Sequence, residues 1–278
     1  MLSIIISSYN ENYFNQLENN IKETIGQDIL YEIIKIENHN KYSINQAYNL
    51  GANKSSYQSL LFIHEDLLFL TKDWGEKLLE LLLNEDIGCI GLAGENYESY
   101  FPSYWYSNPD KKAHIIQEID NGEIFMNKVN FRKDRKIEEI VSIDGVFIAC
   151  KKEVFEKNKF DENLKGFHGY DYDFSVRISR KYQNYVTSEI LIKHYSSGSF
   201  TNDWLENVLK VRKKNGFYPK FQKINKDLEL QKAYNLILLF NRFNYSKLKS
   251  FKILINYINP QAIGFKNCFK ILNRVRYL

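Results

Sequence analysis

Short apolar segments alternate with amphipathic ones over the first 94 residues, and this alternation limits the possible folds more than any other feature of the chain. Four segments have the length and the aliphatic or β-branched content of strands: residues 2–9, 31–38, 59–66 and 87–94. Each is apolar at successive positions, which indicates a strand buried on both faces. The sequence therefore predicts an α/β fold in which a mostly parallel, Rossmann-like sheet is flanked by helices.

The segments between these strands have helical spacing. The first predicted helix is marked by apolar residues three or four positions apart: Phe14, Leu17, Ile21 and Ile25. Residues 43–55 predict a second helix, with Ser43 as its N-cap and Gly51 near its end. Residues 74–85 predict a third helix.

After the fourth strand, the alternation gives way to an aromatic loop and then to a predicted hairpin or irregular insertion at 113–136. Strand and helix patterns return around the dipeptide Asp144-Gly145 and in a loop that runs into a helix within 169–182. The last predicted strand ends at His194, before a Ser/Gly loop. The second half of the chain is therefore expected to complete the domain around the sheet.

The first three predicted strands all end in polar residues. The first ends at 7–10 (Ser-Ser-Tyr-Asn), the second at 37–38 (Glu-Asn) and the third at 64–66 (His-Glu-Asp). The carboxyl ends of parallel strands meet at one edge of a sheet, where open α/β sheets bind ligands. We therefore expect the three clusters to share one ligand site.

Glu65 and Asp66 provide the oxygen ligands that Mg²⁺ or Mn²⁺ prefers, and such a cation would neutralise a phosphate. Alternatively, the two carboxylates only cap the next helix or face solvent. The sequence contains neither GxGxxG nor a Walker loop, so it does not predict phosphate or dinucleotide binding by a glycine-rich loop.

A second group of ionisable residues lies near the start of the later helix. Asp173 and Arg177 are four residues apart and can pair on a helix, whereas Asp171, with His168 nearby, is placed to face a cleft. The positive end of a helix favours the ionised form of a carboxylate at the position of Asp171. The alternative is a helix cap with a surface ion pair, and His194 on its own is also typical of a structural histidine.

No apolar stretch reaches the roughly 18–20 residues needed to cross a bilayer. The three cysteines are far apart and odd in number, so they suggest neither a disulfide framework nor a CxxC metal site: Cys89, Cys150 and Cys268. The first residues also lack the basic region and the longer apolar run of a signal peptide. The expected location is the cytoplasm.

Charge is distributed unevenly along the chain. Residues 204–278 hold 16 Lys/Arg and 3 Asp/Glu, whereas residues 1–203 hold 22 Lys/Arg and 31 Asp/Glu. The basic tail alternates apolar and cationic residues in helical patterns, which suits an anionic membrane surface. It also suits packing on the acidic domain or on a second subunit. Nucleic acid is not an expected partner, because no recognised binding module accompanies the charge.

Six motifs occur in the order found in family 2 glycosyltransferases, and the chain resembles most the bacterial StrF-type branch of that family. The motifs are "SIIISSYNEN", "IKIENHNKYSINQAYNLGANKS", "LLFIHEDLLFL", "SIDGVFIACKKEVF", "GFHGYDYDFSVRI" and "LIKHYSSGSF". The resemblance covers about residues 2–200. It implies a GT-A fold over 1–203, with a nucleotide-sugar half at about 1–95 and an acceptor half at about 96–203. Residues 204–278 then form a basic helical C-terminal region.

The resemblance also implies how the donor is bound. The nucleotide-binding residues are then Ser8, Tyr9, Asn10 and Glu37. Glu37 stands where the family usually has Asp. Asp66 matches the last acid of the family's DxD motif and would bind Mn²⁺ or Mg²⁺ together with His194, whereas His64 replaces the first Asp.

In the acceptor half, "YDYD" is similar to the family's "EDxD", with Tyr170 in place of Glu. Asp171 then matches the catalytic base, which would accept the proton of the acceptor hydroxyl. The remaining donor- and acceptor-site residues are His64, Glu65, Asp144, Gly145, His168 and Tyr170.

The expected activity is that of a metal-dependent, inverting glycosyltransferase. It would move a sugar from a nucleoside-diphosphate donor, with UDP as the expected nucleotide, to a hydroxyl of a growing bacterial surface glycan, lipid-linked or free. The expected place is the inner face of the plasma membrane. Two alternatives stay open: a sugar nucleotidyltransferase, although "SSYNEN" is not the basic glycine-rich loop of that class, and a degenerate nucleotide-sugar-binding protein. A homo-oligomer is also compatible with the tail.

Overall fold

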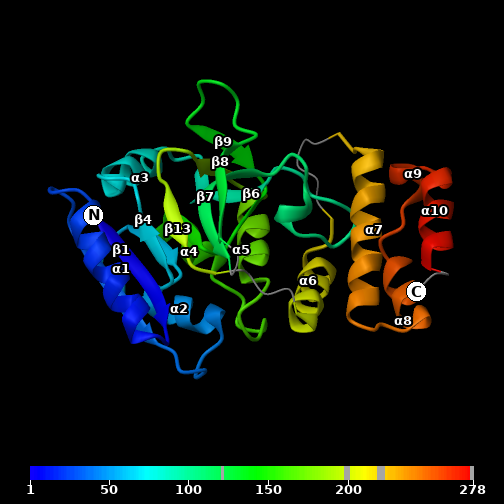
Figure 1. Ribbon diagram of the computed structural model, residues 1–278, viewed down its shortest axis with the longest axis horizontal. Helices are drawn as coiled ribbons and strands as arrows, with labels where there is room; N and C mark the ends of the chain where they lie inside the picture. The colour runs from blue at the N-terminus through cyan, green and yellow to red at the C-terminus, as the bar shows by residue number, and fades with distance from the viewer. Residues whose placement is uncertain (120–121, 197–200, 218–222, 276–278) are drawn as a thin grey trace.

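The computed structural model describes residues 1–119, 122–196, 201–217 and 223–275. Figure 1 shows an elongated molecule with the first strand and helix at one end and the last helices at the opposite end. In the described part of the chain, no helix has both the length and the apolar character that crossing a bilayer requires.

The larger sheet has seven strands in the order β2-β1-β3-β11-β5-β12-β9. Its strands are β1 (Leu2–Ser8), β2 (Tyr31–Glu37), β3 (Ser59–Ile63), β5 (Ile87–Gly91), β9 (Ile137–Ile140), β11 (Phe147–Lys151) and β12 (Gln183–Thr187). β1 pairs in parallel with β2 and β3, and β12 pairs in parallel with β5, whereas β11 and β9 are antiparallel to their neighbours. All strands of this sheet except β11 and β9 therefore run in the same direction, which confirms the predicted mostly parallel sheet.

Helices cover both faces of this sheet. Successive side chains of a strand point to opposite faces, so a strand with apolar residues at successive positions has two faces to bury. Ile4 and Ile6 belong to a buried cluster with residues of α1 (Glu11–Thr24) and α3 (Trp74–Leu82). Ile5 belongs to a second cluster with α2 (Ile44–Lys54), α4 (Lys152–Asn158) and α5 (Tyr170–Ser179). All three residues are fully buried, as expected for a strand covered on both faces.

The first three predicted helices are confirmed. The side chains of Phe14, Leu17 and Ile21 in α1 and of Ile25 just after it are buried. Ser43 caps α2 in a capping box with Gln46: its hydroxyl accepts from the backbone N–H of Gln46, whose side chain in turn accepts from the backbone N–H of Ser43. The sequence therefore placed the elements around the strand ends correctly.

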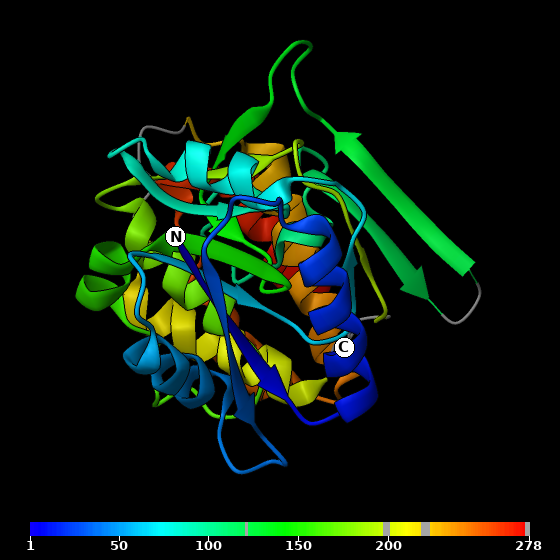
Figure 2. The same ribbon diagram turned by 90° about the vertical axis from the view of Figure 1, so that its left-hand side faces the viewer.

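The smaller sheet has the order β10-β6-β7-β13-β4, with β8 paired to β7. Its strands are β4 (Leu67–Phe69), β6 (Ala93–Glu95), β7 (Lys112–Ile119), β8 (Gly122–Val129), β10 (Ser142–Ile143) and β13 (Ile192–His194). β7 and β8 form the expected hairpin, which projects from the body of the protein in Figure 2. A single-turn 3₁₀ helix, η1 (Trp105–Ser107), precedes β7.

Two predicted strands are wrong in one respect. Residues 87–94 form two strands, β5 and β6, which belong to different sheets, and the segment that ends at His194 likewise forms β12 and β13. In each case the chain crosses from one sheet to the other. The residues before and after the crossing are both apolar, so the sequence pattern does not show where one strand ends and the next begins. At Gly94 a Cβ atom would lie 2.1 Å from the carbonyl oxygen of Ser142, so the pairing of β6 with β10 requires glycine there. Most of the Ser/Gly loop after His194 lies outside the described residues.

The basic C-terminal region is helical, as predicted, with α6 (Asn202–Asn215), α7 (Lys226–Arg242), α8 (Lys247–Leu254), α9 (Pro260–Ile263) and α10 (Phe265–Val275). Two cations join it to the end of β6 and to the loop that follows β6. Arg212 of α6 pairs with Glu98 at 2.8 Å, and Lys232 of α7 pairs with Glu95 at 2.7 Å, all four side chains being at most 3% exposed. α6 and α7 are therefore packed against the acidic body.

Replacing Lys232 with alanine should destabilise the protein by ~3–5 kcal/mol, because it leaves the buried carboxylate of Glu95 without its cation. Urea unfolding measures the loss. The control is Lys22→Ala, which removes an exposed pair with Glu18 and should cost less than ~1 kcal/mol. Equal costs for the two variants would show that Glu95 is not desolvated.

Candidate active site

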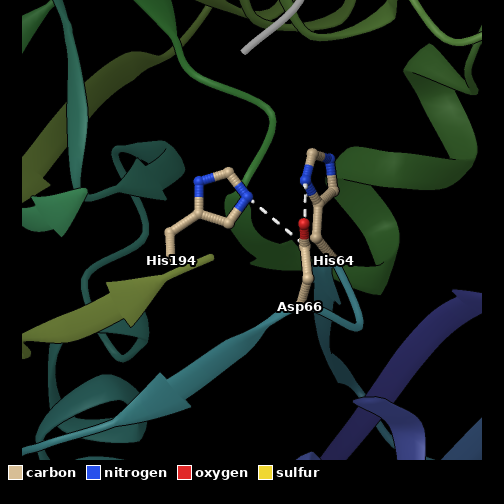
Figure 3. Close-up of side chains that lie close together, drawn as sticks. All are labelled: His64, Asp66 and His194. Atoms are coloured by element: carbon tan, nitrogen blue, oxygen red, sulfur yellow. Dashed lines mark ion pairs between the residues drawn. The ribbon is translucent and has the colours of Figure 1, made fainter. Parts of the chain in front are cut away.

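Three potential metal ligands meet between the two sheets. His64 follows β3, Asp66 precedes β4 and His194 ends β13, and one ligand atom from each lies within 4.8 Å of the others. In Figure 3 the two imidazoles face the Asp66 carboxylate, whose Oδ1 lies 3.3 Å from His194 Nε2 and 3.9 Å from His64 Nδ1. The antiparallel pairing of β13 with β4 places His194 opposite Leu67 and so beside Asp66.

A hydrogen bond to Gln117 orients the imidazole of His194 and sets which of its two nitrogens carries the proton. Its Nδ1 lies 3.2 Å from Gln117 Oε1, and because this oxygen only accepts, Nδ1 carries the proton. Nε2 is then an unprotonated nitrogen, and among the described residues it is buried without a hydrogen-bond partner. A buried nitrogen of this kind fits a metal cation, since metal-binding histidines typically donate their other N–H to an oxygen.

The hydroxyl of Tyr170 orients His64 in a similar way. It lies 3.0 Å from the carbonyl oxygen of Gly145, to which it donates, and 2.8 Å from His64 Nε2. Having given its only proton to the carbonyl, the hydroxyl accepts from Nε2, which leaves Nδ1 unprotonated and facing Asp66. A Cβ atom at Gly145 would lie 2.0 Å from this hydroxyl, so the contact also requires glycine.

The protonation states suit a cation. Desolvation lowers the pKa of His64, which favours the neutral imidazole. The pKa of Asp66 is lowered overall although burial alone would raise it, so the carboxylate form is favoured. A neutral imidazole and a carboxylate are the forms that bind metal.

Asp171 lies in the first turn of α5, and its Oδ2 accepts from the backbone N–H of Gly145 at 3.1 Å. Asp144 lies nearby and accepts from Trp105 Nε1 at 2.7 Å. Burial, followed by the charge of Asp144, raises the pKa of Asp171 to about 7. The helix N-terminus was expected to favour the ionised form, and this expectation is wrong in direction because desolvation and a like charge outweigh the helix dipole.

Two adjoining cavities meet at the histidine–aspartate cluster. The larger, about 490 Å³, contains Asp171 and is walled largely by aromatic side chains: Tyr104, Trp105, Tyr106, Phe167, Tyr172 and Trp204. The smaller, about 160 Å³, is lined at the strand ends by Ser7, Tyr9, Asn38, Glu65 and Asp66. His64, Phe167 and Tyr170 line both cavities. The expected meeting of the three strand ends at one site is confirmed.

The structure brings most of the predicted site residues to these cavities. The larger one is lined by His64, Asp144, Gly145, His168, Tyr170, Asp171 and His194, and the smaller one by Tyr9, His64, Glu65, Asp66 and Tyr170. Desolvation lowers the pKa of His168, which favours its neutral form.

Ser8, Asn10 and Glu37 line neither cavity. Ser8 is buried, Glu37 is exposed at the end of β2, and Asn10 caps α1 by accepting from the backbone N–H groups of Asn12 and Tyr13. Glu65 is 5% exposed and accepts from the backbone N–H groups of Tyr9 and Asn10, so it fixes the end of β1.

Sequence reasoning missed Trp105 and Gln117, and it placed Asn38 at the site only as part of a strand-end cluster, without a role. Asn38 lines the smaller cavity and donates to Ser7 Oγ at 3.0 Å. Trp105 contacts Asp144 from the aromatic loop, whose composition was the only signal for it. Gln117 lies on β7, far from any motif, and nothing in the sequence connects it with His194.

The comparisons with known proteins agree with this geometry. The family model described as "Glycosyltransferase like family" matches residues 3–214. No curated protein matches the sequence.

Two similar solved structures carry the fold. One is described as GalNAc-T7 with UDP, GalNAc and Mn²⁺. It is 13% identical and has a TM-score of 0.56, and the match covers 100% of this chain and 56% of the GalNAc-T7 chain. The other is S. aureus TarS: it is 13% identical and has a TM-score of 0.52, and the match covers 99% of this chain and 52% of TarS. The chain thus spans about half the length of each, and at this identity the likeness shows the fold alone.

Since the family model covers well over half of the sequence and the two solved structures share its fold, the chain belongs to the glycosyltransferase-like family and has the GT-A fold.

Proposed function

We propose that this protein is a metal-dependent glycosyltransferase that moves a sugar from a nucleoside-diphosphate donor to an acceptor hydroxyl. The observation that carries the proposal is the His64–Asp66–His194 cluster between a small polar cavity and a larger one that holds Asp171. A cation at this junction would bind the diphosphate of the donor, with the nucleoside on one side of the diphosphate and the sugar on the other.

The donor nucleoside fits the smaller cavity. Tyr9 and Tyr13 offer aromatic surface for a base, and Asn38 offers an amide for hydrogen bonds to a base or ribose. UDP is the nucleotide we propose, because the similar solved structure GalNAc-T7 was determined with UDP, GalNAc and Mn²⁺. Ser8, Asn10 and Glu37 would then act by shaping the strand ends.

Two imidazoles and one carboxylate would hold the cation, through His64 Nδ1, His194 Nε2 and Asp66. Mg²⁺ prefers a shell of oxygen ligands, and the similar solved structure GalNAc-T7 was determined with Mn²⁺, so we propose Mn²⁺ in preference to Mg²⁺. When bound, the cation would offset the negative charge that develops on the departing diphosphate.

Asp171 is the proposed base. The acceptor oxygen would form a bond to the anomeric carbon while the bond from this carbon to the diphosphate oxygen breaks, and the proton of the hydroxyl would pass to Asp171. A direct attack from the opposite face inverts the configuration at the anomeric carbon, and no covalent enzyme intermediate is needed. A pKa of about 7 suits a base at neutral pH.

The acceptor fits the larger cavity, where aromatic walls offer flat apolar surface for sugar rings. We propose a growing surface glycan of a bacterial cell, built at the cytoplasmic side of the membrane, as the acceptor class. Trp105 would keep Asp144 oriented at the floor of this cavity through its indole N–H.

A donor screen tests the proposed function. UDP-, GDP- and CDP-sugars are incubated with Mn²⁺ and glycan acceptors, and the released nucleotide and the product are identified by mass spectrometry. Release of a nucleoside diphosphate with a lengthened acceptor is the expected result. In a parallel incubation with a nucleoside triphosphate and a sugar 1-phosphate, formation of a nucleotide sugar and pyrophosphate would instead identify a nucleotidyltransferase. Donor binding without turnover would identify a binding protein.

Tyr170→Phe should lower Mn²⁺ affinity ~10–100-fold, because it removes the hydroxyl that fixes the tautomer of His64. The ring is retained, so its edge contact with Tyr48 persists. Titration of the apoprotein with Mn²⁺, followed by electron paramagnetic resonance, measures the change.

Tyr172→Phe is the matched control. Tyr172 lines the same cavity, but its hydroxyl lies 3.5 Å from Arg212 and does not contact the cluster. Mn²⁺ affinity that stays at the wild-type value in Tyr170→Phe would rule out this role of the hydroxyl.

A further inference from the structure

The outer face of α8 and α10 forms an open groove of about 1010 Å³ at the end of the molecule opposite to β1. Its lining includes Lys247, Leu248, Phe251, Lys266, Phe269 and Lys270. Leu248 is 64% exposed and Phe269 is 72% exposed. Apolar side chains are therefore gathered on a surface that no described part of the protein covers.

The sequence of α10 produces this face by carrying apolar residues on two sides. Cys268, Ile271 and Val275 are buried in the C-terminal helical cluster. Phe265 and Phe269, four residues apart, lie outside it and are more than 70% exposed. The inner side suffices to attach the helix, so the outer aromatic residues are not explained by folding and mark an interaction surface.

The charged residues that line the groove are all lysines, namely Lys247, Lys266 and Lys270. Residues 230–278 contain nine Lys or Arg and no Asp or Glu. Elsewhere in the C-terminal region, Arg212 and Lys232 are each paired with a carboxylate. Among the described residues, by contrast, no carboxylate forms an ion pair with Lys266 or Lys270. The groove therefore fits a partner that is both anionic and able to receive apolar side chains.

We propose that this α8–α10 face docks the protein onto an anionic lipid bilayer. Phe265, Phe269 and Leu248 would enter the boundary between headgroups and acyl chains, while the lysines contact lipid phosphates. A second copy of the same face would bring like charges together. Nucleic acid would neutralise the lysines but leave the apolar side chains without the apolar layer that a bilayer offers. This inference uses no residue of the catalytic cavities and goes beyond the proposed function.

Sedimentation with vesicles tests the inference on the full chain. The protein should bind vesicles of phosphatidylcholine with phosphatidylglycerol, bind phosphatidylcholine alone far more weakly, and lose binding as salt is raised. The double variant Lys266→Glu/Lys270→Glu should lower the partition coefficient at least ~30-fold, since each lysine near an anionic surface contributes roughly fivefold. Phe265→Ser/Phe269→Ser should also lower it, although it leaves the charge unchanged.

Leu83→Ser and Lys157→Glu are the controls, since they change exposed residues far from the groove along the chain. Both should bind vesicles as the wild type does. Three results would overturn the inference. They are equal binding to the two kinds of vesicle, a loss of vesicle binding in the controls as large as in the groove variants, and tighter binding of double-stranded DNA than of anionic vesicles. Turnover with a water-soluble acceptor should be unchanged in the groove variants, so a failure of docking and a failure of the catalytic proposal can be told apart.

Discussion

Asp171→Asn is expected to lower turnover by ~10²–10⁴-fold while donor binding persists, because the amide cannot accept the proton of the acceptor hydroxyl. The asparagine oxygen can still accept from the backbone N–H of Gly145, so the local structure should be preserved. Single-turnover rates and donor affinity, measured on the same preparation, separate the two effects. Turnover close to that of the wild type would show that Asp171 is not the base.

The neighbouring acid provides the control. Asp173 is 1% exposed and accepts from Arg177, Lys214 and Asn215, so Asp173→Asn should act through stability. Its melting temperature should fall, while the turnover of the folded fraction should stay near that of the wild type. The same rate loss in both aspartate variants would point to a general disturbance of α5.

The pKa of Asp171 also predicts how activity and stability change with pH. A base with a pKa of about 7 is protonated in acid, so kcat/KM should rise as pH increases through this value. Because the folded-state pKa lies above the ordinary value of 3.8, the stabilising contribution of this group is complete below pH ~4 and is lost as pH rises through about 7.

Asp171→Asn should therefore be more stable than the wild type at pH 8, by a margin that shrinks by ~1.4 kcal/mol per pH unit as pH falls from about 7 towards 5. Urea unfolding in the presence of EDTA measures this margin without bound metal. A margin that is independent of pH would show that burial and Asp144 do not raise this pKa.

Asp66→Asn is expected to abolish most Mn²⁺ binding, because it removes the only carboxylate of the cluster. The loss should exceed the ~10–100-fold effect typical of residues that only hold a ligand in place. Electron paramagnetic resonance of Mn²⁺ measures it directly. Glu65→Gln is the control, since Glu65 contacts the backbone of Tyr9 and Asn10 and lies outside the cluster. Unchanged Mn²⁺ binding in Asp66→Asn would remove the cluster as the metal site.

The strand ends could be predicted because they depend on local pattern. Polar residues after a buried strand lie at the edge of the sheet whatever the rest of the chain does, and the clusters that begin at Ser7, Glu37 and His64 all reach one site. Which residue of a cluster faces the ligand was harder to predict. Neighbouring residues point to opposite sides, so Asn38 lines the cavity whereas Glu37 is exposed.

Contacts between distant segments could not be predicted from the sequence. His64 and Tyr170 both depart from the family pattern, in two separate motifs. Their side chains are nevertheless hydrogen-bonded to each other, although they lie 106 residues apart in the sequence. The pKa of Asp171 is raised by burial and by Asp144, which the chain brings near only through the tertiary fold. Sequence patterns and motifs describe residues that are close along the chain, whereas this hydrogen bond and this pKa depend on tertiary packing.

The most direct test of the central proposal is the affinity of the wild-type protein for UDP with and without Mn²⁺. Isothermal titration calorimetry should show UDP binding in the presence of Mn²⁺ and a sharp loss of affinity after EDTA treatment, because His64, Asp66 and His194 would hold the cation that meets the diphosphate. UDP binding of the same affinity in both conditions would contradict a metal-dependent donor site at this cluster.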